Sequence, residues 1–161
     1  MKVVEILAKL EDVTEECPTC VDYIEEMVPT HKGRYQNQKN SYKLNEEAVK
    51  KLREVIADYE IVAVFADWCG DARKVVPVLS LLEEELDIRI RALGGMTKPP
   101  YGSDKHWAVP PSPKEVDIFE ITSSPTILIF DKEGNEIGRI RTRAKMTPTI
   151  EQEIVKIIED Q

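Results

Sequence analysis

Residues 61–74 read IVAVFADWCGDARK, an apolar run that leads into a polar turn and then into the start of a helical pattern. A short continuous apolar run is typical of a strand that is buried on both faces of a sheet. The turn holds Cys69. The first turn of a helix favours a thiolate, because its backbone N–H groups are unpaired and lie at the positive end of the helix dipole. The stretch therefore predicts a strand, a nucleophilic cysteine and a helix in direct succession.

Outward from this turn, strands and helices alternate to the end of the sequence. The expected strands are 61–66, 88–93, 126–130 and 136–142, and the expected helices are 71–86, 114–119 and 147–160, the last capped by Thr147 with Pro148 at its first position. Turn residues at 132–135 predict that the last two strands form an antiparallel hairpin. The order β-α-β-α-β-β-α predicts an α/β fold whose mixed central sheet is flanked by helices on both faces.

The residues before this alternating region read as helical. They predict a division into a helical N-terminal extension, residues 1–60, and a core, residues 61–161. The helical patterns of the extension are expected over Val3–Leu10, 17–27 and 45–59, the last with Asn45 as its N-cap. Residues 31–40 are polar, which predicts a loop between the second and third of these helices.

Three short motifs have a recognisable order along the sequence. Trp68-Cys69-Gly70 follows a buried strand, Pro77 lies eight residues beyond the cysteine, and Ser124-Pro125-Thr126 opens a later strand. In this pattern the chain resembles the thioredoxin family over about residues 44–161, and in particular a thioredoxin-like branch with Trp-Cys-Gly-Asp. The resemblance implies a thioredoxin fold with a cis bond before Pro125. It also implies that Cys69 is catalytic and that the substrate contacts Trp68, Gly70, Ser124 and Pro125.

Two positions depart from the pattern of that family. Ala72 stands where the second cysteine of the active site is expected, and Ala63 stands where the family has a buried carboxylate. Both changes remove groups that serve the second half of a dithiol reaction. Asp71 adds a negative charge next to the thiol, which Arg73 and Lys74 partly offset.

A second cysteine motif, Cys17-Pro18-Thr19-Cys20, stands at the start of a helical pattern. At this spacing on a helix start, two thiols come within disulfide range, and backbone amides favour the thiolate of the first. Cys17 and Cys20 are therefore a redox pair that acts alone or resolves Cys69, half of a zinc site, or two inert cysteines on one helix face. A structural zinc site needs four ligands, and only Cys69, His31 and His106 remain. Metal is the least favoured of the three, and no cofactor is predicted.

The net charge and the N-terminal sequence limit the classes of partner and the cellular locations to be expected. A net charge of −8 argues against a nucleic acid or an anionic membrane as partner, since both repel an acidic chain at long range. Glu5 lies inside the apolar stretch at residues 1–7, which lacks the apolar core of a signal peptide and the length to span a bilayer. The sequence predicts a cytoplasmic protein, in which cysteines are more often thiols or transient disulfides than permanent cross-links.

Two hypotheses of function follow from the residues and the resemblance together. The first is a thiol–disulfide oxidoreductase in which Cys69 attacks a protein or low-molecular-weight disulfide, and either Cys17/Cys20 or an external thiol resolves the mixed disulfide. The second is a redox-silent binding module that holds a partner in the groove beside Pro125. The absence of a second cysteine at Ala72 and of a carboxylate at Ala63 favours the second hypothesis.

Overall fold

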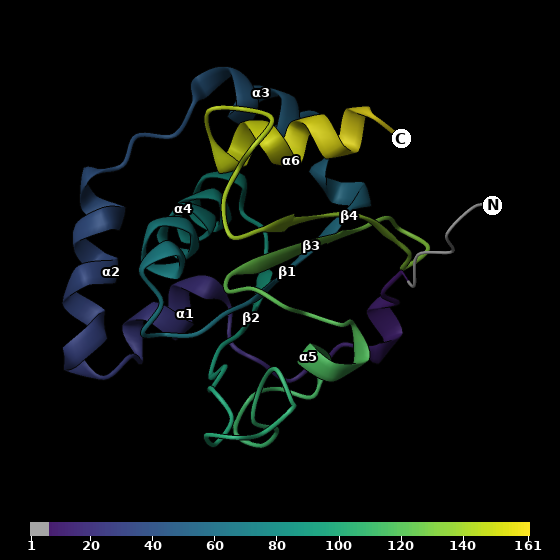
Figure 1. The fold of residues 1–161 in the computed structure, drawn as a ribbon. Helices are drawn as coiled ribbons and strands as arrows, with labels where there is room; N and C mark the ends of the chain where they lie inside the picture. The colour runs from purple at the N-terminus through teal and green to yellow at the C-terminus, as the bar shows by residue number, and fades with distance from the viewer. Residues whose placement is uncertain (1–6) are drawn as a thin grey trace.

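The computed structural model of the chain describes residues 7–161. At its centre is a four-stranded sheet in the order β2-β1-β3-β4 (Figure 1). The strands are β1 (Glu60–Val64), β2 (Ile90–Leu93), β3 (Thr126–Phe130) and β4 (Glu136–Arg141). β1 pairs in parallel with β2 and antiparallel with β3, and β3 and β4 form the expected antiparallel hairpin. The prediction of an α/β fold with a mixed sheet is confirmed.

The helices of residues 7–161 differ widely in length. They are α1 (Cys20–Glu25), α2 (Pro29–Ser41), α3 (Glu46–Val55), α4 (Gly70–Leu86), α5 (Glu115–Ile118) and α6 (Ile150–Glu159), with 3₁₀ turns at Leu10–Asp12 and Ile56–Asp58. Asn45 caps α3 as expected, because its side-chain oxygen accepts a hydrogen bond from the Ala48 N–H. None of these helices is both long and apolar enough to cross a membrane.

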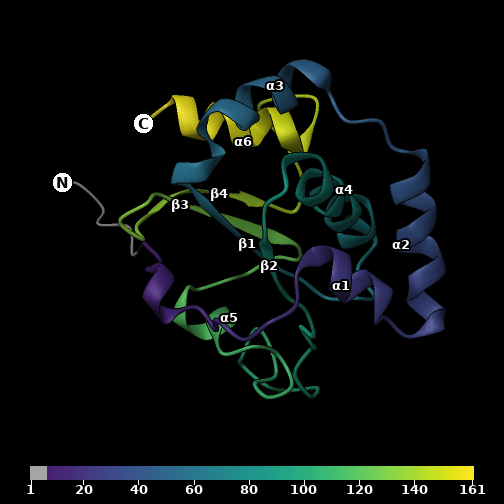
Figure 2. The same cartoon turned by 180° about the vertical axis from the view of Figure 1, so that it is seen from behind.

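The two faces of the sheet are covered differently. Successive side chains of a strand point to opposite faces. Ile61 and Ala63 accordingly belong to one apolar cluster with side chains of α1–α4 and α6, and Val62 and Val64 belong to another with α5 and the loop before it. Figures 1 and 2 show this division from opposite sides. Helices flank both faces, as predicted, but one face carries the short α5 and, through Leu10, the 3₁₀ turn at Leu10–Asp12.

Two expected helix boundaries are wrong. Residues 31–40, expected as a loop, lie inside α2. Tyr35 is the one fully buried side chain of that helix, so no apolar residue repeats at helical spacing. The last helix is capped by Thr149 and not by Thr147, because the Thr149 hydroxyl accepts from the Gln152 N–H. The Thr147 hydroxyl instead donates to the Thr149 carbonyl oxygen over 2.8 Å.

The start of α1 is also later than predicted. The helix begins at Cys20, because the Thr19 hydroxyl accepts from the Asp22 N–H over 3.1 Å and makes Thr19 the N-cap. Thr19 itself pairs with Arg91 of β2, so the segment before the helix runs extended beside the sheet edge. The helical pattern expected over Val3–Leu10 begins outside the described residues, and from Leu10 the chain forms a 3₁₀ turn.

A buried carboxylate joins α1, α4 and β2. Glu83 of α4 is 5% exposed, and its two oxygens accept from the Val21 N–H over 2.8 Å and the Ile90 N–H over 3.0 Å. Burial raises the pKa of Glu83 to about 7, although backbone N–H donors including those of Ile90 and Val21 pull it down. Glu83 therefore links three elements through a group that titrates near neutral pH.

This titration predicts a pH-dependent stability. The folded chain holds the Glu83 proton to a higher pH than the unfolded chain, whose carboxyl titrates near 4.5. The contribution to the free energy of unfolding is therefore complete below that pH and declines up to about pH 7. Over this interval we expect the wild type to lose up to about 3 kcal/mol of stability relative to Glu83→Gln, which has no carboxyl group to titrate at this position. Urea unfolding at several pH values measures this difference, and a constant difference would contradict the titration.

Candidate functional site

Cys69 is the N-cap of α4, directly beyond the carboxyl end of β1. Its Sγ lies 3.2 Å from the carbonyl oxygen of Ser124, toward which the S–H points as donor. The Ser124 hydroxyl in turn accepts from the Ala66 N–H over 2.9 Å, and the bond between Ser124 and Pro125 is cis. The turn after β1 and the start of β3 are thus held together around one half-buried thiol.

Trp68 and Gly70 border this thiol. The Trp68 side chain is 43% exposed, and its indole N–H donates to the Met96 carbonyl oxygen over 3.2 Å. The Lys98 ammonium lies 5.1 Å from the centroid of the indole ring, within the range of a cation–π contact. Gly70 is exposed. Trp68 therefore lies on the rim of the site, fixed to the loop that follows β2.

Two tyrosines that the sequence did not single out form hydrogen bonds to the turn that carries Cys69. Tyr23 of α1 donates its hydroxyl to the Asp67 carboxylate over 2.6 Å, and Tyr35 of α2 donates to the Asp67 carbonyl oxygen over 3.1 Å. Burial, and then the Asp67 carboxylate, raises the pKa of both phenols, so both stay protonated and keep donating. Residues of the first 60 therefore position the loop that carries Cys69.

The two alanines that depart from the family pattern are both fully buried. Ala63 lies in the middle of β1, and Ala72 lies in the first turn of α4 on the side of the core. Neither can titrate or form a bond to sulfur. These two positions therefore contribute neither a second thiol nor a carboxylate to the site.

Cys17 and Cys20 pack into different sides of the molecule. Cys20 is fully buried in the cluster that covers the helical face of the sheet, whereas Cys17 packs against the cluster on the face of α5. The extended Thr19 lies between them and turns their side chains apart. All three cysteines are free thiols. Among residues 7–161, no three His, Cys, Asp or Glu side chains gather as a metal site would require.

Neither thiol of the CxxC motif is set up as a nucleophile. Burial raises the pKa of Cys17, and the charges of Arg89 and Arg91 offset only part of that rise. Burial raises the pKa of Cys20 well above its usual value, and the charge of Glu83 adds to the effect. These environments favour the neutral thiol at both positions.

Backbone contacts fix the Cys17 segment beside β2, since the Ala92 N–H donates to the Pro18 carbonyl oxygen over 2.9 Å and Thr19 pairs with Arg91. The Arg89 guanidinium donates to the Cys17 carbonyl oxygen over 2.7 Å, and Arg89 precedes the start of β2. Cys69 follows the end of β1, and the two strands are parallel. The Cys17 Sγ contacts the Thr14 carbonyl oxygen at 3.5 Å, whereas the Cys69 Sγ contacts the Ser124 carbonyl oxygen at 3.2 Å, so the two thiols are engaged with different parts of the chain.

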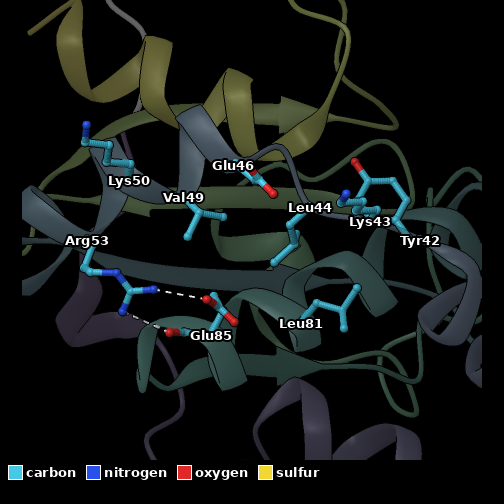
Figure 3. A pocket seen from close by; sticks show the side chains of 9 residues that line it. All are labelled: Tyr42, Lys43, Leu44, Glu46, Val49, Lys50, Arg53, Leu81 and Glu85. Atoms are coloured by element: carbon cyan, nitrogen blue, oxygen red, sulfur yellow. Dashed lines mark hydrogen bonds and ion pairs between the residues drawn. The ribbon is translucent and has the colours of Figure 1, made fainter.

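A cavity of about 570 Å³ between α3 and α4 is separate from this site (Figure 3). Val49 of α3 lies opposite Leu81 of α4, and the Arg53 Nη2 pairs with a Glu85 carboxylate oxygen over 3.2 Å. Leu81 lies three turns of α4 beyond Cys69, roughly 18 Å at about 1.5 Å per residue. This cavity therefore has no part in the chemistry of the thiol.

Comparison with known proteins supports a thioredoxin-like family for the chain. A family model described as thioredoxin matches residues 17–94, a range that contains Cys69 and ends before Pro125. Thioredoxins of Chlamydia pneumoniae and Chlamydia muridarum are 30% and 32% identical to the chain, over 80 and 79 residues. These matches cover 50% and 49% of the chain, and 65% and 64% of the two relatives. The chain thus spans less than two thirds of the length of either relative.

Two solved structures share the fold. One is a Pseudomonas aeruginosa protein of unknown function and the other is an HIV epitope scaffold, each with a TM-score of 0.70 and 14% identity. The first match covers 95% of this chain and 98% of the neighbour, and the second 96% and 99%. At this identity the likeness concerns the fold alone. With the observed mixed sheet and its helices, it confirms the thioredoxin fold that the sequence motifs imply.

Proposed function

We propose that this chain is a thioredoxin-like protein that carries out thiol–disulfide exchange with Cys69 as its one nucleophile. The observation that carries the proposal is the position of the Cys69 Sγ. It lies at the N-terminus of the seventeen-residue helix α4 and 3.2 Å from the Ser124 carbonyl oxygen, beside a cis proline. An extended substrate segment docks against the backbone at Ser124-Pro125, and Trp68 and Gly70 border it.

The reaction has two exchange steps. The Cys69 thiolate attacks one sulfur of a substrate disulfide, so that a bond forms between Cys69 and that sulfur and the other sulfur leaves as a thiolate. A second thiol then attacks the mixed disulfide and releases Cys69 as a thiolate. The resolving thiol stays bonded to the half that it removes from Cys69, and a second external thiol frees that half by a further exchange away from the site. The substrate disulfide thus gains two electrons in total, and the two external thiols that supply them leave as one disulfide.

An external thiol supplies the second step. With Ala72 in place of a second cysteine, no thiol lies beside Cys69 in the first turn of α4. The Cys17 thiol contacts the Thr14 carbonyl oxygen, the Cys20 thiol is fully buried, and the environments of both favour the neutral form. A cytoplasmic location, as predicted from the sequence, would provide low-molecular-weight thiols for this step.

Replacing Cys17 tests how the intermediate is resolved. We expect Cys17→Ser to keep the wild-type rate of disulfide turnover, within about twofold, when an external thiol is present in excess. The assay follows reduction of hydroxyethyl disulfide in the presence of a monothiol. A loss of turnover with an unchanged unfolding transition would assign Cys17 the resolving role and contradict the external thiol.

A redox-silent binding module is the second candidate. The Cys69 thiol is itself engaged with the Ser124 carbonyl oxygen, and Ala63 and Ala72 provide no titratable group. In this case the groove at Pro125 binds a partner without sulfur chemistry. Two results together would favour this candidate over exchange. The wild-type chain would form no mixed disulfide, and the Cys69→Ser chain would still bind its partner.

A further inference from the structure

Helix α2 has a charge pattern that stands out in so acidic a chain. The chain has a net charge of −8, yet Pro29–Ser41 contains Lys32, Arg34 and Lys39 and no acidic residue. Lys32 and Lys39 each pair with a nearby glutamate, at 3.8 Å and 2.6 Å. Arg34 has no such pair among the described residues, so its charge is available to a ligand.

Arg34 lines a cavity that starts next to Cys69. The cavity has a volume of about 420 Å³ and lies between α2 and the first turn of α4. Its lining consists of three cations, three neutral polar side chains and one glycine: Arg34, Arg73, Lys74, Asn37, Gln38, Ser41 and Gly70. Gly70 is bonded to Cys69, so the cavity begins one residue from the thiol. A volume of this order suits a small molecule.

No carboxylate among the described residues lies within ion-pair distance of these cations. Arg34, Arg73 and Lys74 form no ion pair within 4.0 Å in residues 7–161. Asp67, close by in sequence, accepts from the Tyr23 hydroxyl. Asp71 is a neighbour of Gly70 but does not line the cavity. The Gln38 amide donates to the Lys74 carbonyl oxygen over 3.3 Å and so joins α2 to α4 beside the cations.

A basic cavity matters because the rest of the chain repels anions. At long range a net charge of −8 disfavours an approaching anion, and only a local group of cations can reverse this preference at the site. Guanidinium groups donate in pairs to carboxylate and phosphate oxygens, which gives such a site direction as well as charge. The arrangement suits an anionic group held within reach of Cys69.

From this arrangement we infer that the cavity of Arg34, Arg73 and Lys74 selects low-molecular-weight disulfides with carboxylate or phosphate groups as substrates of Cys69. The inference rests on the proposed function and names its substrate class. The Cys69 thiolate attacks the sulfur whose substituent carries the anion and forms a mixed disulfide. The other half leaves as a thiolate, and an external thiol later releases the bound half.

The test compares three small disulfides that differ in charge. They are dithiodiglycolate, which is an anion, hydroxyethyl disulfide, which is neutral, and cystamine, which is a cation. The rate of mixed-disulfide formation at Cys69 is measured for wild type and for Arg34→Gln/Arg73→Gln. Because each disulfide is compared with itself, differences in leaving-group chemistry cancel. Lys50→Gln/Lys132→Gln removes the same charge from two exposed positions outside the cavity and is the matched control.

We expect the Arg34→Gln/Arg73→Gln chain to react about tenfold more slowly with the anion and within about twofold of wild type with the neutral disulfide. The control pair should leave all three rates within about twofold. The tenfold effect should fade in about 1 M salt, where the Debye length is roughly 3 Å. Equal losses for all three disulfides, or no loss for the anion, overturn the inference and leave the proposed function standing. No reaction of Cys69 with the neutral disulfide overturns both.

Discussion

Cys69→Ser is expected to lower disulfide turnover at least about a hundredfold, because the reaction needs a thiolate and a serine hydroxyl does not ionise near neutral pH. The substitution is close in shape, and the hydroxyl can still donate to the Ser124 carbonyl oxygen, which the Sγ contacts at 3.2 Å. We therefore expect the unfolding transition to change little. The measurement is the initial rate of hydroxyethyl disulfide reduction with excess monothiol, after subtraction of the uncatalysed rate.

Cys20→Ser is a poor control for this experiment, because Cys20 is fully buried and its loss disturbs the core. Cys17→Ser is the better one, since Cys17 is only partly buried. If Cys69→Ser kept most of its turnover while Cys17→Ser lost it, the nucleophile would be assigned to the wrong cysteine. If neither variant changed the rate, the chain would have no catalytic thiol.

Gly94→Ala is expected to destabilise the fold by about 3 kcal/mol. A Cβ at Gly94 would lie 1.9 Å from the Tyr23 hydroxyl oxygen and 2.2 Å from the Tyr23 Cζ. At these distances the Tyr23 ring must move. The movement disturbs its edge-on packing against Phe65, where the ring centroids are 4.9 Å apart. Its displacement also breaks the hydrogen bond to Asp67, so the turn that carries Cys69 loses a support. Chemical denaturation measures the loss.

A double-mutant cycle with Tyr23→Ala isolates this clash. Removing the ring creates the space that the new methyl group needs, so Gly94→Ala should cost little in the Tyr23→Ala background. The double variant should be about as stable as Tyr23→Ala alone. If the two losses of stability simply added, or if Gly94→Ala alone cost less than about 1 kcal/mol, Tyr23 would not be what restricts position 94.

The sequence predicts the elements that have a strong repeating pattern. β3 is expected at 126–130 and forms there, because all five of its side chains are buried and residues 127–130 are continuously apolar. α4 carries apolar residues on one side through four turns and is found one residue from its expected start. α2 has one fully buried residue, Tyr35, in thirteen, so hydrophobic periodicity has nothing to repeat. Pro29 at its first turn was the one usable signal.

In the candidate site, the turn that carries Cys69 could be predicted from the succession of neighbouring elements in the sequence. A buried strand followed by a helix start places the thiol without knowledge of the rest of the fold. The contacts of Asp67 with Tyr23 and Tyr35 could not be found, since they join residues 44 and 32 positions apart. The CxxC spacing predicts neighbouring thiols only if the four residues lie at the start of a helix. Thr19 is extended, and Cys17 and Cys20 pack against different apolar clusters.

Peptide mapping of the mixed disulfide shows whether Cys69 alone attacks a disulfide. The reduced chain is exposed briefly to hydroxyethyl disulfide, quenched in acid and digested, and the adduct is located by mass spectrometry. We expect one adduct at the early time points, on the peptide with Cys69, and unmodified Cys17 and Cys20. An early adduct on Cys17 or Cys20 with Cys69 unmodified would contradict this expectation.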